Sequence, residues 1–243
     1  MTEDRIVYLP DIHVPFNIPL SPVFEFIEDF KPTIVILGGD VHDWTSVCHW
    51  IADQSRALEG GTIQQNYAEL RYTVLIPLKK AAPKAKKIYL KGNHERWLDL
   101  AIELNPNGKS YWELESNLSK EYQILGENVP FGAGPHLYYI HGVYVNKHHA
   151  ASTVAAYDKS VIYGHTHDIQ SFMHISPVDI KQFKTAQSAG CLCTMNPHYM
   201  RNKPNKWANG FNFAYVDKQT GFFSFVQVYI VDNKFWANGR RYK

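Results

Sequence analysis

The sequence is poor in cysteine, lacks long apolar runs and carries almost no excess charge. Its three cysteines are Cys48, Cys191 and Cys193, and they form no CxxC pair. That pattern excludes a disulfide framework and indicates a reducing compartment. The first residues are acidic and lead directly into a strand-like segment, without the basic and apolar regions of a secretory leader. No apolar run approaches the length of a membrane span. We therefore expect a cytoplasmic protein with no membrane partner.

The net charge does not indicate a particular binding partner. The formal net charge of the 243 residues is +2, so no global excess of positive charge attracts nucleic acid. Apolar residues make up 45% and charged residues 20%, which is ordinary for a globular protein and too apolar for disorder. The length fits one domain over residues 1–243, and the sequence leaves the oligomeric state open.

Two patterns follow one another along the chain. In the first, apolar runs of strand length end in polar residues, at 5–13, 33–43, 87–95, 137–142 and 160–168. Segments with helical spacing lie between these runs, at 21–30, 63–82 and 146–157. We expect Ser21 to cap the first helix and Pro77 to disturb the second.

The second pattern occupies residues 178–243, where aromatic and polar residues alternate and turn residues occur at 217–221 and 232–233. Strands that alternate with helices predict βαβ units around a mostly parallel sheet. The predicted fold class is therefore α/β, with βαβ-built sheets, helices on the outer faces and antiparallel strands at the C-terminal end.

The five runs end in side chains that bind metals. The carboxyl ends of parallel strands meet at one edge of a sheet, where ligands bind. The chain contains 12 histidines, and the polar residues at these ends are Asp11, His13, Asp40, Asn93, His94, His141, His165 and His167. Carboxylate, amide and imidazole groups without thiolate suit Mn, Fe, Zn or Ni. One metal leaves several of these side chains without a role, whereas two metals with a shared carboxylate use them all.

The ordered motifs DIH, GGD, GNHE, HG and GHTH resemble those of the calcineurin-like metallophosphoesterase superfamily, over roughly residues 5–170. The resemblance implies a β-sandwich core that holds two divalent metal ions, with Mn expected and Fe, Zn or Ni as the other options. It also implies these roles: first-metal ligands Asp11, His13 and His167, second-metal ligands Asn93, His141 and His165, bridging ligand Asp40, and uncoordinated imidazole His94.

The chemistry of such a site needs no serine or cysteine nucleophile. Two cations about 3.5–4 Å apart clamp phosphate oxygens and lower the pKa of a shared water, so that a metal-bridging hydroxide attacks phosphorus. Protonated His94 stabilises the transition-state charge or protonates the departing alkoxide. We expect Asp43 or Glu95 to orient His94. Arg96 is expected either to grip a phosphate oxygen or, as we favour, to brace a ligand carboxylate.

The substrate is less well defined than the reaction. The stretch GGDVHDWTS, which contains Asp40, differs after that residue from the GDYVDRG-like sequence of Ser/Thr protein phosphatases. The GHTH pair resembles the phosphodiesterase and nuclease branches of the superfamily, of bacterial or phage type. We expect hydrolysis of phosphodiesters in nucleotides or nucleic acid. The alternatives are a phosphomonoesterase that acts on phosphoproteins or small phosphates, and a non-catalytic module that binds metal and nucleotide.

Some of these residues also have a plainer interpretation. His165 and His167 fit a surface turn in which both rings are hydrogen-bonded, and Asn93 with His94 fits an ordinary turn. His148 and His149 begin a predicted helix and are interpreted as solvated.

Three further features are not assigned to the metal site. Cys191 and Cys193 alternate in a strand-like segment and are interpreted as core packing. Segment 44–66, interrupted by glycines, is a candidate loop over the site. Stretch 197–211 interleaves basic and aromatic residues, which suits nucleic-acid binding or a solvated loop anchored by its aromatics.

Overall fold

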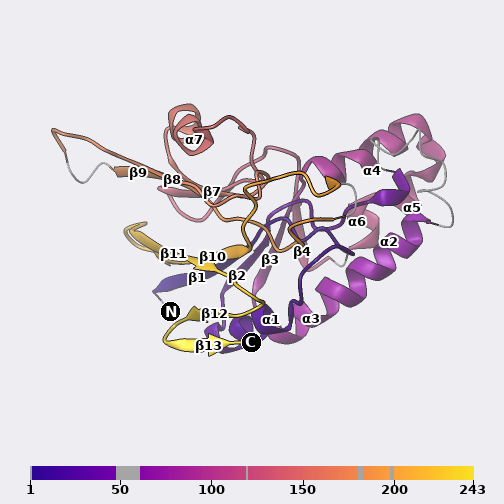
Figure 1. Cartoon of the computed structure of the whole chain (residues 1–243), viewed down its shortest axis with the longest axis horizontal. Helices are drawn as coiled ribbons and strands as arrows, with labels where there is room; N and C mark the ends of the chain where they lie inside the picture. The colour runs from indigo at the N-terminus through magenta and orange to yellow at the C-terminus, as the bar shows by residue number, and fades with distance from the viewer. Residues whose placement is uncertain (1, 48–60, 119, 180–182, 198–199) are drawn as a thin grey trace.

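The computed structural model describes residues 2–47, 61–118, 120–179, 183–197 and 200–243. In this part of the chain one sheet has six strands, in the spatial order β11 (Phe223–Tyr229), β10 (Gly210–Asp217), β1 (Glu3–Leu9), β2 (Ile34–Leu37), β3 (Lys86–Leu90) and β4 (Tyr122–Leu125). A second sheet has five, in the order β5 (Phe131–Gly132), β6 (Leu137–Tyr139), β7 (Ser160–Tyr163), β9 (Phe183–Ser188) and β8 (Ser171–Ile175). The two sheets lie face to face (Figure 1).

Helices cover the outer face of each sheet. On the six-stranded sheet lie α1 (Ser21–Phe30), α2 (Ile63–Leu70) and α3 (Ile76–Ala81), and on the five-stranded sheet lies α7 (His149–Tyr157) (Figure 1). The remaining helices are α4 (Asn93–Leu104), α5 (Lys109–Trp112) and α6 (Leu114–Asn117). The predicted α/β class is therefore confirmed, with helices outside and sheets inside.

Most residues of β1, β2 and β3 are buried on both faces of the sheet because a different layer covers each face. In β1, Val7 and Leu9 join the cluster that includes Phe26 of α1. Ile6 and Tyr8 face the other way, into a cluster that includes residues of β6 and β7. This explains why the sequence shows continuous apolar runs rather than alternation at these strands.

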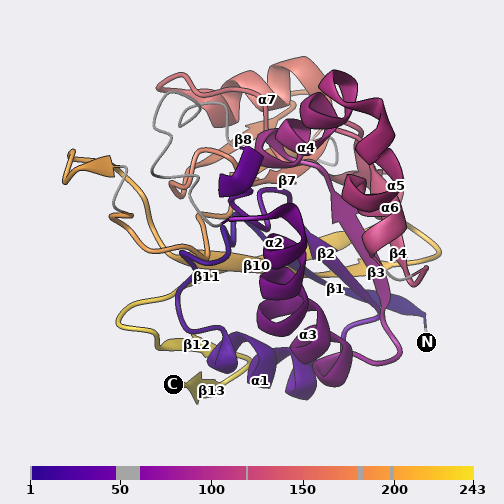
Figure 2. The same cartoon turned by 90° about the vertical axis from the view of Figure 1, so that its right-hand side faces the viewer.

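The predicted helices form with small differences. α1 spans the predicted residues, but Leu20 is its N-cap and Ser21 is the first helical residue, so the cap prediction was wrong. In the predicted helix 63–82, α2 and α3 are joined by the π-helical turn η4 (Arg71–Leu75), which ends two residues before Pro77. Because Pro77 has no N–H to donate, a local change of hydrogen bonding is expected there. Figure 2 shows α2 and α3 end to end across the strands.

The C-terminal strands follow the predicted antiparallel pattern. β10 pairs with β1 and with β11, and the turn between β10 and β11 contains Gly221. β11 leads through Asp232 and Asn233, both with positive φ, into the hairpin of β12 (Phe235–Ala237) and β13 (Arg240–Tyr242).

The prediction was less accurate between residues 183 and 194. β9 pairs with β7 in parallel, although only antiparallel strands were expected here. The segment that contains Cys191 and Cys193 makes isolated bridges to Asn209 and Asn17 instead of a strand. Among the described residues, every helix is too short or too polar to cross a membrane.

Candidate metal centre

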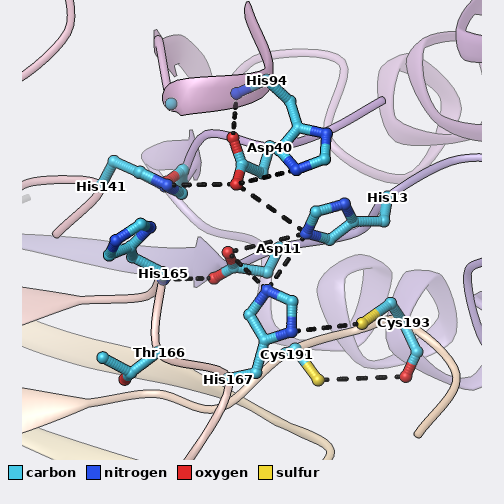
Figure 3. Close-up of polar contacts among 12 residues, drawn as sticks. Asp11, His13, Asp40, His94, His141, His165, Thr166, His167, Cys191 and Cys193 are labelled. Atoms are coloured by element: carbon cyan, nitrogen blue, oxygen red, sulfur yellow. Dashed lines mark hydrogen bonds and ion pairs between the residues drawn. The ribbon is translucent and has the colours of Figure 1, made fainter. Parts of the chain in front are cut away.

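The carboxyl ends of five strands bring the predicted ligands to one edge of the two sheets (Figure 3). β1 is followed by Asp11 and His13, β2 by Asp40, β6 by His141, and β7 by His165 and His167. Asn93 and His94 follow β3 and begin α4, a helix that the sequence analysis did not predict. The site therefore combines residues that are more than 150 positions apart in sequence.

The backbone at the site is held in an unusual conformation. Five of these residues have positive φ: Asp11 (44°), His13 (51°), Asp40 (48°), His165 (69°) and His167 (58°). Residues other than glycine adopt such angles rarely, and the strain persists only where surrounding contacts impose it. Such angles cluster at functional sites. Here they turn consecutive polar side chains toward one place.

Each of the two central carboxylates commits one oxygen to a backbone amide. The N–H of His94 donates to Asp40 Oδ1 and the N–H of His165 donates to Asp11 Oδ2, both at 2.8 Å. These bonds require close approach, because a Cβ on Gly92 would collide with Asp40 and one on Gly164 would collide with Asp11. The glycines of the GNHE and GHTH motifs thus seat the carboxylates. Each carboxylate keeps its other oxygen for the centre.

Asp11, His13 and His167 form one group of converging ligand atoms. His13 Nε2 lies 3.1 Å from His167 Nε2, and His167 Nε2 lies 3.2 Å from Asp11 Oδ1. Asp11 is fully buried, and its Oδ1 has no hydrogen-bond partner in the described part of the chain. A buried carboxylate oxygen without a hydrogen bond is costly unless a cation compensates it.

Asp40, His141 and His165 form a second group. His141 Nε2 lies 3.3 Å from Asp40 Oδ2 and 3.1 Å from Asn93 Oδ1. His141 Nδ1 lies 2.9 Å from the carbonyl oxygen of Gly38, so it is the nitrogen that carries the proton in the neutral ring. The Nε2 lone pair then faces two oxygen acceptors. Three electron-rich atoms that converge in this way fit a bound cation.

The pKa of His141 reflects the same arrangement. Burial alone would lower this pKa, but the charge of Asp40 and the contact with it raise it to about 10. Burial would raise the pKa of Asp40, yet His141 and His94 hold it well below its usual range. Without metal, a proton on His141 therefore supplies the positive charge that the site requires.

His94 belongs to neither of these two groups, although one of its ring nitrogens lies within 4.8 Å of ligand atoms of His13 and Asp43. Its Nε2 is 4.0 Å from Asp40 Oδ2, and its side chain is 15% exposed. Its Nδ1 lies 3.3 Å from Asp43 Oδ1, and His13 Nδ1 lies 2.9 Å from the same oxygen. Asp43 thus orients both rings, as one of the two predicted options stated.

Glu95 does not contact His94 in the way that one of the two predicted options required. It is fully buried and accepts hydrogen bonds from the N–H groups of Asp40 and Gly92 through Oε2 and of Val41 through Oε1. Tyr89 Oη also donates to Oε1, at 2.8 Å. Glu95 therefore fixes the backbone that carries Asp40 and does not orient His94.

Arg96 faces away from the centre. Its side chain is 60% exposed and its guanidinium lies 3.8 Å from Glu127. The favoured prediction, that Arg96 braces a ligand carboxylate, was wrong. Successive side chains of a helix point about 100° apart, so in α4 Glu95 points inward while Arg96 points to solvent.

A hydrogen-bonded network that was not predicted from the sequence lies behind the GHTH loop. His149, interpreted as solvated, is buried, and its ring lies 2.7 Å from Tyr163 Oη and 3.1 Å from Asp168 Oδ2. Thr166 Oγ1 donates to Asp168 Oδ1 at 2.7 Å. Since Thr166 lies between His165 and His167, the network anchors their loop to α7. The Asp directly after GHTH was the available signal.

Two tryptophans pack on histidines of the site. The ring centroids of Trp97 and His94 are 4.0 Å apart, and those of Trp207 and His167 are 4.2 Å apart. Trp207 belongs to the basic and aromatic stretch 197–211, of which residues 198–199 lie outside the described residues. Of the candidate loop 44–66, residues 48–60, which include Cys48, also lie outside them.

No protein-family model matches the sequence, and no curated protein matches it. Solved structures similar to this chain include a single mutant of Vps29 from Entamoeba histolytica, with a TM-score of 0.49, 13% identity and coverage of 94% of both chains. Vps29 from Chaetomium thermophilum has a TM-score of 0.43 and 10% identity, and the match covers 92% of this chain and 96% of that one. Neither likeness bears on function, which is therefore inferred from the geometry of the site.

Proposed function

We propose that this chain is a two-metal phosphoesterase that prefers phosphodiesters of nucleotides or nucleic acid. The observation that carries the proposal is the position of Asp40 Oδ2 between nitrogens of the two groups. This oxygen lies 3.3 Å from His141 Nε2 and 3.9 Å from His13 Nε2. A carboxylate in this position is suited to bridge two cations.

In this proposal the remaining ligand atoms would divide between two cations in the way that the sequence resemblance implies. Asp11, His13 and His167 would hold one metal, and Asn93, His141 and His165 the other. Mn²⁺ is the expected ion because oxygen and imidazole ligands without thiolate suit it. Such a pair of metals supplies positive charge that activates water and stabilises a phosphoryl transition state.

His94 is the proton donor in this proposal. Its Nδ1 is engaged by Asp43, so its Nε2 is the free nitrogen and it lies near the carboxylate shared by both groups. A proton held at Nε2 is available to the departing alkoxide. Asn93 and His94 also occupy the first turn of α4, where the helix dipole favours an anionic substrate.

Charge around the site supports a diester over a monoester. A phosphate diester carries one negative charge, whereas a phosphate monoester at neutral pH carries nearly two. Arg96, the cation nearest in sequence to His94, pairs with Glu127 and adds no positive charge to the centre. Trp207 is partly exposed beside the centre and offers aromatic surface that suits a nucleobase, whereas Trp97 is buried against His94.

Chromogenic substrates test the proposal. Protein stripped of metal is assayed on bis(p-nitrophenyl) phosphate and p-nitrophenyl phosphate, with Mn, Ni, Zn, Fe or Mg added singly. We expect metal-restored activity with a preference for the diester, and none in Asp40→Asn. A strong preference for the monoester would assign the chain to the phosphomonoesterases. Two bound metals without hydrolysis of either substrate would show a binding module.

A further inference from the structure

Cys191, Cys193 and His167 place three buried donors beside the Asp/His centre and outside it. Both cysteines are fully buried and His167 is 5% exposed. One ligand atom from each residue lies within 4.8 Å of the other two. In Figure 3 the two thiols lie on the side of His167 that faces away from Asp40. The proposed phosphoesterase mechanism uses neither thiol.

The backbone that carries the two thiols is fixed by hydrogen bonds. Asn209 Nδ2 donates to the carbonyl oxygens of Cys193 at 2.6 Å and Cys191 at 3.2 Å. The N–H of Cys191 donates to the carbonyl oxygen of Ala208 at 3.0 Å. Cys193 Sγ faces His167 Nδ1, while Cys191 Sγ contacts the carbonyl oxygens of Cys193 and Ala208 and still lies within 4.8 Å of the other two donors. Simple packing requires apolar volume but no convergence of donor atoms.

The distance between Cys193 and His167 fits two ligands of a tetrahedral metal site. Cys193 Sγ lies 3.8 Å from His167 Nδ1. Bonds of about 2.3 Å from zinc to sulfur and about 2.0–2.1 Å from zinc to nitrogen separate the two ligand atoms by roughly 3.6 Å in a tetrahedron. A set of two thiolates and one imidazole selects thiophilic ions over Mn²⁺ or Mg²⁺.

We propose that Cys191, Cys193 and His167 Nδ1 form a separate site for a thiophilic divalent cation of the Zn²⁺ or Cd²⁺ class. Binding there releases the thiol protons, and the sulfurs and Nδ1 each donate an electron pair to the cation. The proton of neutral His167 then resides on Nε2. This N–H faces Asp11 Oδ1, 3.2 Å away, and can donate a hydrogen bond to it.

His167 consequently belongs to two sites through its two nitrogens. The Asp/His centre needs the lone pair of Nε2, whereas the thiol site needs that of Nδ1, and a neutral ring offers only one of them. A thiophilic cation therefore opposes the first metal of the Asp/His centre. The thiol site itself does not depend on the proposed function, but this opposition rests on it.

Cadmium titration tests the thiol site without any activity measurement. Protein stripped of metal and kept in a non-thiol reductant is titrated with Cd²⁺, and the ultraviolet charge-transfer band from thiolate to cadmium is recorded. We expect a band in the wild-type chain that is lost in Cys191→Ser and in Cys193→Ser. Cys48→Ser is the matched control, since it removes the remaining cysteine. It should keep the band, as should Asp40→Asn.

Two results would overturn the thiol site. One is a wild-type chain without the band, and the other is a band that persists in both Cys191→Ser and Cys193→Ser. Far-ultraviolet circular dichroism shows that each variant is folded. Release of bound Mn²⁺, followed by electron paramagnetic resonance, tests the opposition: Cys193→Ser should need roughly tenfold more Cd²⁺ than the wild type. Equal cadmium requirements would refute it.

Discussion

His13 and His167 face each other through their Nε2 atoms at 3.1 Å. His13 Nδ1 lies 2.9 Å from Asp43 Oδ1, so its proton points to that carboxylate and the Nε2 lone pair points inward. His167 Nε2 in turn lies 3.2 Å from the buried Asp11 Oδ1. Two imidazoles and a carboxylate directed at one point repel one another unless a cation or a ring proton lies between them. This relationship is the basis of the account of the centre.

Asp40→Asn should remove both metals. An amide in this position has less charge and one oxygen instead of two, and the remaining oxygen cannot both accept the His94 N–H and face His141 and His13. Elemental analysis after dialysis against Mn²⁺ should show well under one ion per chain. Asp99→Asn is the matched control: Asp99 lies on α4 and pairs with Lys91, so this variant should retain two ions. Two full-occupancy ions in Asp40→Asn would contradict the bridging role.

His94→Ala should separate catalysis from metal binding. His94 contributes no atom to either group of ligands, so the metal content should stay at the wild-type level. Loss of a general acid should lower kcat by roughly 100-fold or more. Steady-state hydrolysis of bis(p-nitrophenyl) phosphate measures this change. His136→Ala, an exposed histidine before β6, is the control with unchanged kcat. Parallel loss of metal and activity in His94→Ala would make His94 a ligand.

Glu95→Ala should destabilise the fold rather than merely slow the reaction. The substitution leaves the buried N–H groups of Asp40, Val41 and Gly92 without their acceptor. Because each unsatisfied buried donor costs about 1–3 kcal/mol, we expect a total loss of about 3 kcal/mol or more. Urea denaturation measures the free energy of unfolding. Arg96→Ala, at the adjacent exposed position, should change it by less than about 0.5 kcal/mol. A similar small change in Glu95→Ala would refute the role assigned to Glu95.

Metal-free protein should lose stability as the pH rises through the neutral and alkaline range. The folded chain keeps the proton of His141 up to a pKa of about 10, whereas an unfolded histidine loses it near about 6.5. The stabilisation is complete below about 6.5 and is lost as pH approaches the folded pKa, because the folded state binds more protons in this window. Melting temperatures measured in EDTA between these values should decline. The decline should be shallower in His141→Gln, and an equal slope in both proteins would contradict the assignment.

The sequence predicted the candidate site well where its residues lie at the ends of strands. Apolar runs that stop at Asp11, Asp40 and His141 indicated both the parallel sheet and the edge where the ligands meet. Positions along the strands could be predicted because burial on both faces leaves a clear pattern of residue types. The spatial grouping required only the rule that such ends converge.

Other features could not be read from sequence because they depend on how side chains meet across the fold. Glu95 contacts backbone groups up to 55 positions away, and His149 reaches Asp168 only because α7 packs behind the GHTH loop. The direction of Arg96 follows from the start of α4, a boundary that its polar first turn concealed. The parallel pairing of β9 with β7 is likewise a property of the assembled sheet.

Anomalous X-ray diffraction from crystals of the chain with Mn²⁺ tests the central claim most directly. The account predicts two anomalous peaks about 3.5–4 Å apart, one on each side of Asp40 Oδ2. The first should lie among Asp11, His13 and His167, and the second beside His141 and His165. A single peak, or peaks remote from Asp40, would contradict the two-metal centre.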